Sequence, residues 1–351
     1  MSDDDGSPRE PRGDTGSAGD RVRTLDAGRH GDGSRERSVV PGAEFRSYYG
    51  RPVLKPPVWE WKIPAYLFTG GLSASAALLA AGADLTGRPA LCRASRLGSF
   101  GALAASMYLL VADLGRPERF LHMLRVAKPS SPMSVGTWIL VAFGPGDALA
   151  AMAELLPVSL RATLPGRLLR MAARPAGLSA AVFAPGVASY TAALLSQTAV
   201  PAWHEAHREL PFVFTGSAAA SGGGLGMLLA PVAEAGPARR LGAAGAVAEL
   251  VASRLIERRP GLVTKAYTTG RAHRLRRASE YLTLGGALAA VTVARRSRPA
   301  AAAAGLALLA GSALQRFGTF EAGVASTKDP AYVVVPQRER LRAREAERRE
   351  S

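Results

Sequence analysis

Side chains that carry redox chemistry are scarce in this sequence. It has one cysteine, Cys92, and five histidines among 351 residues. One thiol excludes an internal disulfide and any iron–sulfur cluster held by this chain alone, because such clusters need several thiolates. The histidines lie outside the long uncharged runs, whereas a bis-histidine haem needs two of them on facing membrane helices. We therefore expect a chain without haem, iron–sulfur cluster or metal site.

What the chain has instead is a series of long uncharged runs, although its mean hydropathy is only +0.07. About 20 apolar residues cross a bilayer as a helix. Four strong runs approach or exceed that length: Ile63–Ala83, Pro129–Gly146, Pro175–Trp203 and Leu210–Ala233. Four weaker ones are Leu97–Ala112, Leu241–Ile256, Tyr281–Ala294 and Pro299–Gln315. The sequence predicts an all-α integral membrane protein with eight transmembrane helices.

A short internal similarity suggests how these helices are grouped. Phe68-Thr-Gly-Gly-Leu-Ser-Ala-Ser75 in the first run resembles Phe214-Thr-Gly-Ser-Ala-Ala-Ala-Ser221 in the fifth. A repeat displaced by four spans keeps its direction through the bilayer, so it would be a parallel repeat; chance similarity between two small-residue helices is the alternative. We predict a disordered polar tail (1–45), two four-helix bundles (46–200 and 201–325) and a charged C-terminal tail (326–351).

Positive charge dominates, with a net charge of +16. Because the arginines crowd the tails and short loops, they are expected to meet lipid headgroups rather than nucleic acid. The long, acidic and polar N-terminus does not resemble a cleavable signal peptide. Basic residues before the first run, Arg46, Arg51, Lys55 and Lys62, favour cytoplasmic termini. We expect a multi-pass protein of the plasma membrane.

The loop from Asp113 to Trp138, between the second and third runs, is unusually dense in charge. Its ionisable members are Asp113, Arg116, Glu118, Arg119, His122, Arg125 and Lys128. Asp113 is a candidate proton acceptor at the mouth of a membrane site, with His122 as second choice. The alternative is an ordinary ion pair between Asp113 and Arg116 or Arg119.

Aromatic residues near this loop suggest which kind of ligand a site there could bind. Tyr66, Tyr108 and Trp138 are expected near the face that carries it, either as interfacial belt residues or as walls of a site. A flat quinone head needs aromatic walls and a few polar groups for its oxygens. Tyr66, Asp113 and His122 could supply those groups.

Two acids inside the apolar runs are candidates for a proton path, because ionisable residues within a bilayer are costly. Asp147 follows Gly144-Pro145-Gly146, where the helix could admit water or end early. Glu249 lies in the sixth run, and pairing with an arginine such as Arg254 is its plainer interpretation.

Five motifs together resemble the NrfD/PsrC family of membrane subunits, in order and over roughly residues 45–340. They are Trp59-Glu-Trp-Lys-Ile-Pro-Ala-Tyr-Leu-Phe-Thr-Gly-Gly71, the Asp113–Phe120 motif, Lys128-Pro-Ser-Ser-Pro-Met-Ser-Val-Gly-Thr-Trp138, the paired segments Thr198–Ala206 and Glu209–Ser217, and Phe320–Pro330. Some relatives carry a histidine and an asparagine early in the first helix, where this chain has Tyr66 and Ile63. Tyr66 is therefore our substitute hydrogen-bond donor.

The resemblance implies a haem-free subunit of two four-helix bundles. Such subunits exchange electrons between the quinone pool, of menaquinone or ubiquinone type, and a ferredoxin-like iron–sulfur subunit, which relays them to a molybdopterin subunit. The quinone site is then expected at Tyr66, Tyr108, Asp113 and Trp138, and partner docking at Arg116, Glu118, Arg119, Arg125 and Lys128. A passive anchor or proton-coupled subunit without quinone, and a small-solute transporter, remain alternatives.

Overall fold

The computed structural model describes residues 53–350, apart from the side chains of Arg119 and Glu350, and this part of the chain is helical without strands. The predicted disordered tail 1–45 lies outside the described residues. The long helices are α1 (Lys62–Leu85), α2 (Pro89–Asp113), α3 (Pro132–Leu155), α4 (Leu164–Ser196), α6 (Leu210–Leu229), α7 (Gly236–Arg258), α9 (Gly270–Val291), α10 (Arg298–Lys328) and α11 (Ala331–Glu350). Short elements connect them: η2 (Pro117–Leu124), η3 (Val158–Leu160), α5 (Pro201–Glu205), η4 (Leu262–Thr264), α8 (Lys265–Thr268) and η5 (Val293–Arg295).

Proline marks the beginning of most long helices. A proline stands in the first two positions of α2, α3, α4, α6, α7 and α10. Its ring presets the helical φ, and its missing N–H would have no intrahelical partner there anyway. Ser131, Thr163 and Ser297 also cap α3, α4 and α10 by accepting a backbone N–H. Local sequence therefore explains where these helices begin.

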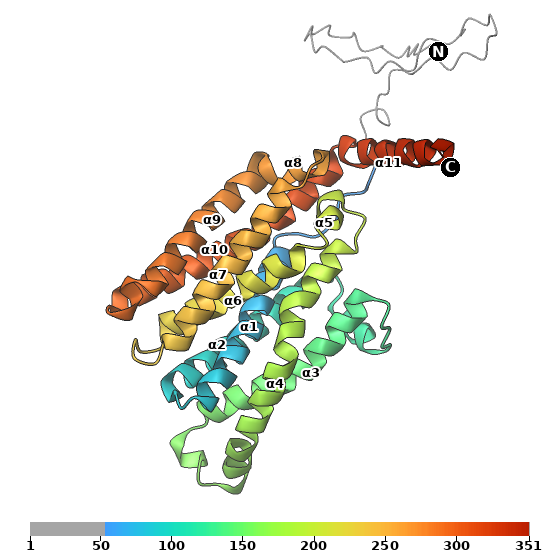
Figure 1. Cartoon of the computed structure of the whole chain (residues 1–351). Helices are drawn as coiled ribbons and strands as arrows, with labels where there is room; N and C mark the ends of the chain where they lie inside the picture. Colours follow the sequence, from blue (N-terminus) through green and yellow to red (C-terminus); the bar gives the residue numbers. More distant parts are fainter. Residues whose placement is uncertain (1–52, 351) are drawn as a thin grey trace, which may run out of the picture. The chain divides into compact units, whose positions relative to one another are not determined.

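The helices of residues 53–350 pack side by side (Figure 1). Each of α1–α4 contacts the next along the chain, and α1 also contacts α4. The same holds for α6, α7, α9 and α10, where α6 also contacts α10. Among the apolar helices α1 and α6 are the most buried, and they contact each other. The division of the chain at residue 200 and the parallel repeat stay predictions.

Within residues 53–350, six helices are long and apolar enough to cross a membrane: α1, α2, α3, α4, α6 and α10. The all-α membrane class is confirmed, whereas the predicted count of eight is not. On α7, Val247, Val251 and Leu255 are more than half exposed. Their spacing of four places them on one outward stripe, while the buried side of the helix consists of small and apolar residues and Glu249. We therefore keep α7, and α9 with its similar stripe, as predicted spans.

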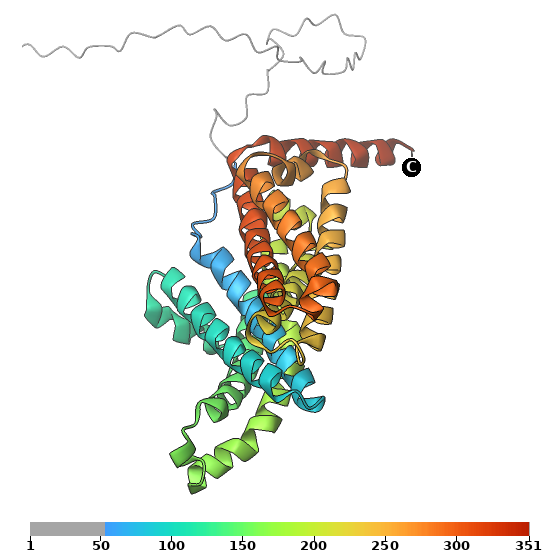
Figure 2. The same cartoon turned by 90° about the vertical axis from the view of Figure 1, so that its left-hand side faces the viewer.

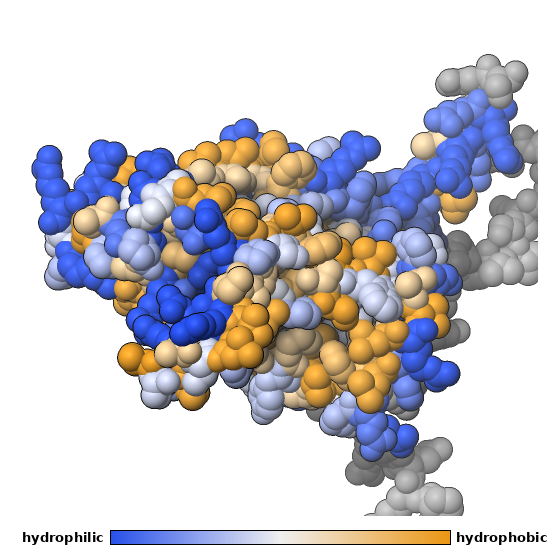
Figure 3. All heavy atoms as spheres, turned by 90° about the horizontal axis from the view of Figure 1, so that it is seen from below, coloured by the Kyte–Doolittle hydropathy of each residue, from blue (hydrophilic) through white to orange (hydrophobic). Residues whose placement is uncertain are grey.

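The surface alternates between apolar and charged regions. Seen from the side shown in Figure 3, broad apolar stretches lie beside separate hydrophilic patches. Exposed apolar area of this extent marks a surface meant for lipid or protein. At the C-terminal end, the charged helix α11 runs across the ends of the long helices rather than along them (Figure 2). It occupies most of the region predicted as a charged tail.

The course of α3 corrects one expectation. Helix α3 continues through Pro145 to Leu155, so the Gly144-Pro145-Gly146 segment does not end the helix early. Proline is tolerated within membrane helices, where neighbouring groups satisfy the freed carbonyl. Asp147 consequently lies in the middle of α3, and its residue is only 3% exposed.

Candidate functional site

A cavity of about 110 Å³ lies among the first four long helices, near the N-terminal end of α1. It is almost entirely apolar, and the helices contribute residues at helical spacing, so each presents one face to it. Its lining is Trp59, Ile63, Tyr66 and Leu67; Leu110, Asp113 and Leu114; Met123; Met133, Thr137 and Leu140; and Tyr190, Leu194 and Leu195. The predicted residues Tyr66 and Asp113 therefore meet at one cavity.

Few polar groups face this cavity. The hydroxyls of Tyr66 and Tyr190, on α1 and α4, are hydrogen-bonded to each other. Thr137 donates its hydroxyl to the carbonyl of Met133 one turn earlier, at 2.9 Å. The Asp113 carboxylate is thus the one ionisable acid among the lining residues. An apolar space with convergent polar groups at its edge is the usual form of a small-molecule site.

Trp59 connects the cavity wall to helices α5 and α10. Its ring stacks on Trp203, with centroids 5.9 Å apart and planes 20° apart. Trp203 is fully buried and donates its indole N–H to the carbonyl of Thr319 at 2.8 Å. It also contacts Phe320 on α10. This stack holds the segment before α1 against the core, which positions the cavity wall.

The charged loop covers one side of the cavity. Met123, from η2, reaches the lining, while Arg116, Glu118, Arg125 and Lys128 are all exposed. The side chain of Arg119 lies outside the described part. The loop therefore contributes an apolar side chain to the cavity and exposes charged side chains on its outer surface.

Three residues predicted for the site lie elsewhere. Tyr108 is 73% exposed and does not line the cavity, because it points to the face of α2 opposite Leu110 and Asp113. Trp138 is 41% exposed and lies outside the lining, beside Thr137. His122 is exposed on η2. The rotation of each helix about its own axis sets the direction of these side chains.

Among the described side chains, the cation that faces the Asp113 carboxylate is Lys62, at the start of α1, and not Arg116. The expected pairing with Arg119 stays a prediction, because that side chain lies outside the described part. Lys62 is in turn paired with Glu60 at 3.2 Å. Asp113 consequently lies between the cavity and a charged pair at the membrane edge.

Glu249 does face an arginine, as its plainer interpretation expects, but that residue is Arg316 and not Arg254. Arg254 forms an ion pair with Glu280 on α9 instead. Arg254 comes five residues after Glu249 on a helix with 3.6 residues per turn. It therefore lies on a different side of α7, which is exposed. Glu249 is 1% exposed, faces the buried Arg316, and lies 3.4 Å from the Thr283 hydroxyl.

Sequence reasoning missed Tyr190. It lies in the middle of a strong apolar run, and 124 positions separate it from Tyr66. A buried tyrosine hydroxyl needs a hydrogen-bond partner, so a lone tyrosine inside a span was a usable signal. In the sequence, Trp59 stands out only as the first residue of a family motif. Its position in the lining depends on the stack with Trp203.

The described residues thus form a multi-pass, all-α membrane protein with an apolar cavity between its first four long helices. The sequence matches the family described as "Polysulphide reductase, NrfD" over residues 53–258. It is also 32% identical over 152 residues to a polysulfide reductase subunit of Wolinella succinogenes, an alignment that covers 40% of this sequence and 48% of that protein. The protein belongs to the NrfD family, which confirms the resemblance in the motifs. The aligned part spans about half the length of that relative.

Proposed function

We propose that this protein is the quinone-reactive membrane subunit of a respiratory oxidoreductase complex. It passes electrons between the membrane quinone pool and a peripheral iron–sulfur subunit. The observation that carries the proposal is the cavity that joins Tyr66, Tyr190 and Asp113 at the membrane end of α1 and α2. Family membership supports it, since the relative is a named subunit of polysulfide reductase.

The lining suits a quinone head. A dry cavity of about 150 Å³ accepts a benzene ring, and this one, at about 110 Å³ and partly open, is close to that size. Leucine, isoleucine, methionine and tryptophan side chains supply the apolar walls, and the polar groups stand at separate places on the edge. Flat rings with two oxygens need this arrangement.

A quinol bound there would supply two electrons and two protons when oxidised. The work of the protein is then to orient the ring and to take up the protons. The Asp113 carboxylate can accept a proton, and the Lys62 side chain faces it. The Tyr66 and Tyr190 hydroxyls can bind a ring oxygen by rotating away from each other.

The partner is proposed to dock on the exposed charged surface of the loop. Arg116, Glu118, Arg125 and Lys128 are exposed on the same loop whose Met123 lines the cavity. A docked iron–sulfur subunit would thereby bring its acceptor close to the ring, and a molybdopterin subunit would follow it. Cytoplasmic termini would place this face on the inner side of the membrane.

Quinone binding can be tested on the full-length protein alone in detergent. Leu110→Trp should fill the cavity, because Leu110 lines it, and we expect at least a tenfold weaker affinity for decylubiquinone, measured by titration calorimetry. Leu78→Trp is the matched control, since Leu78 is 43% exposed and lies outside the lining. A parent protein that binds no decylubiquinone, or equal affinity in both variants, would favour a passive anchor.

A further inference from the structure

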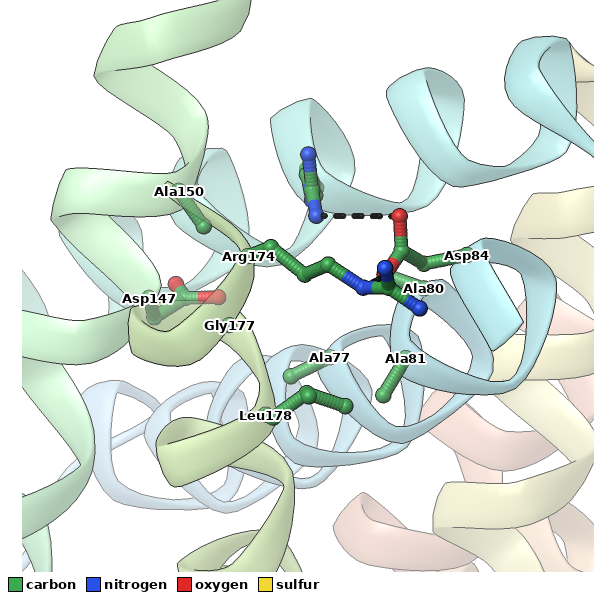
Figure 4. A pocket seen from close by; sticks show the side chains of 10 residues that line it. Ala77, Ala80, Ala81, Asp84, Asp147, Ala150, Arg174, Gly177 and Leu178 are labelled. Atoms are coloured by element: carbon green, nitrogen blue, oxygen red, sulfur yellow. Dashed lines mark ion pairs between the residues drawn. The ribbon is translucent and has the colours of Figure 1, made fainter. Parts of the chain in front are cut away.

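A second, much smaller cavity lies between α1, α2, α3 and α4, further along the helices from the first. Its volume of about 10 Å³ is near the roughly 10–15 Å³ that one water molecule requires. Five small residues leave this space open: Ala77, Ala80, Ala81, Ala150 and Gly177. The other lining residues include four that can ionise: Asp84, Arg96, Asp147 and Arg174. Figure 4 shows Asp147 at one side of this pocket, with Arg174 and Asp84 beyond it.

Asp147 is the inner end of this pocket. The residue is only 3% exposed, and its Oδ2 atom has no hydrogen-bond partner among the described residues. A buried carboxylate oxygen without a partner is costly in a low-dielectric interior. A water in the adjoining space would satisfy it.

The other carboxylate oxygen of Asp147, Oδ1, contacts Ser99, whose hydroxyl lies within hydrogen-bond distance of two acceptors. Ser99 Oγ lies 2.6 Å from Asp147 Oδ1 and 2.8 Å from the carbonyl oxygen of Ser73. One hydroxyl proton cannot serve both acceptors at once. If Asp147 carries a proton, its O–H donates to Ser99 Oγ, and the Ser99 hydroxyl is free to donate to Ser73. The observed geometry therefore suits the protonated acid.

The outer end of the pocket is a cluster of charges. Arg96 lies 2.8 Å from Glu154 and 3.8 Å from Asp84, and Arg174 lies 2.9 Å from Asp84. Arg174 is 62% exposed, and exposed ion pairs are weak, so this side of the mouth opens easily. The buried Cys92 thiol lies near the same charges.

This mouth and the larger cavity lie at opposite ends of α1. Tyr66 and Asp84 are 18 residues apart, which is about 27 Å at 1.5 Å per residue. That separation approaches the roughly 30 Å of a bilayer core. Asp147 lies between the two ends, seven residues or about 10 Å beyond Leu140 along α3.

We propose that Asp147 takes up and releases a proton through this pocket, from the membrane face opposite the larger cavity. The incoming proton forms an O–H bond on the carboxyl group and leaves a water molecule behind; release reverses this step, and no electron moves. Exchange at Asp147 stands independently of any quinone. Only its use in coupling proton movement to electron transfer rests on the proposed function.

Infrared spectroscopy of the full-length protein in phosphatidylcholine vesicles, without quinone, tests the proposal. We expect a C=O band of a protonated carboxylic acid that weakens as the pH is raised and is lost in Asp147→Asn. Asp147→Glu should restore a titrating band, and Asp329→Asn, in an exposed acid, should leave it unchanged. Glu249 is the other buried acid among the described residues and can contribute a band of its own. A band that does not titrate, or that keeps the parent intensity in Asp147→Asn, would overturn the assignment.

The route is tested by the rate at which the same band shifts in deuterated water. Gly177→Val should fill the pocket and slow exchange at least tenfold. Gly177→Ala should slow exchange by a smaller factor and should fold normally, since its Cβ would lie at an ordinary contact distance of 3.4 Å from Ala150 Cβ. Gly101→Val is the control, because nothing lies within 4 Å of a Cβ there. Unchanged exchange in both Gly177 variants would refute this route, and failed decylubiquinone binding would not affect either result.

Discussion

Replacing Asp113 by asparagine is expected to slow quinol-driven electron transfer at least about 100-fold while the complex still assembles. Asparagine keeps the size of the side chain but cannot accept a proton, and a positioned acid or base typically contributes about 10²–10⁴ in rate. Asp113 is the ionisable acid of the cavity lining, and Lys62 faces it. The measurement is decylubiquinol oxidation by the complex purified from membranes with its native partners.

Assembly and folding need a separate readout in that experiment. The subunit ratio on a gel and the affinity for decylubiquinone should stay within about twofold of the parent, because proton acceptance contributes little to ground-state binding. Asp329→Asn is the matched control: its side-chain carbonyl can still accept the Ala331 N–H that Asp329 now binds at 2.9 Å. Turnover at the parent rate in Asp113→Asn would show that protons leave by another group.

Replacing Gly223 by valine is expected to remove most of the folded protein. A Cβ at this position on α6 would lie 2.5 Å from the carbonyl oxygen of Ala238 and from the Cα of Gly242, both backbone atoms of α7. Backbone cannot yield as a side chain can, so the two helices would have to separate. Small residues at helix interfaces allow such close approach in membranes, where packing replaces the hydrophobic drive between helices.

The yield of monodisperse protein in size-exclusion chromatography should fall at least about tenfold for Gly223→Val. Overpacking of a filled interior typically costs about 1–3 kcal/mol and more where the backbone is involved. Gly101→Val makes the same change on α2, where nothing lies within 4 Å, and should leave the yield near that of the parent. Equal yields in the two variants would mean that α6 and α7 can move apart without loss of folded protein.

Much of the fold was predictable from local sequence. The predicted run Ile63–Ala83 became α1, Lys62–Leu85, and Leu210–Ala233 became α6, Leu210–Leu229. The prediction for α9 was less accurate: it began at Tyr281, but the helix begins at Gly270. The reason is that charged residues also form helix where they extend beyond the lipid or face the protein interior, as the buried Arg276 does.

The candidate site was only half predictable. An acid at the end of an apolar run is costly, which makes Asp113 a candidate, and Tyr66 is a candidate as an aromatic residue near the charged loop. The same argument from aromatic residues selects Tyr108, yet Tyr108 faces outward. Distance from the end of a run is a local property, whereas the direction of a side chain around its helix depends on which neighbours that helix packs against.

The sequence by itself determined the membrane class, the approximate spans and the family, because hydropathy, prolines at helix starts and ordered motifs are local features that need no partner. Only the tertiary structure decided which polar groups meet. It joined Tyr66 to Tyr190 and Asp147 to Ser99, it gave Arg254 to Glu280 rather than to Glu249, and it left Tyr108 outside. These pairings depend on the packing and rotation of helices far apart in the sequence, which no short stretch of residues specifies.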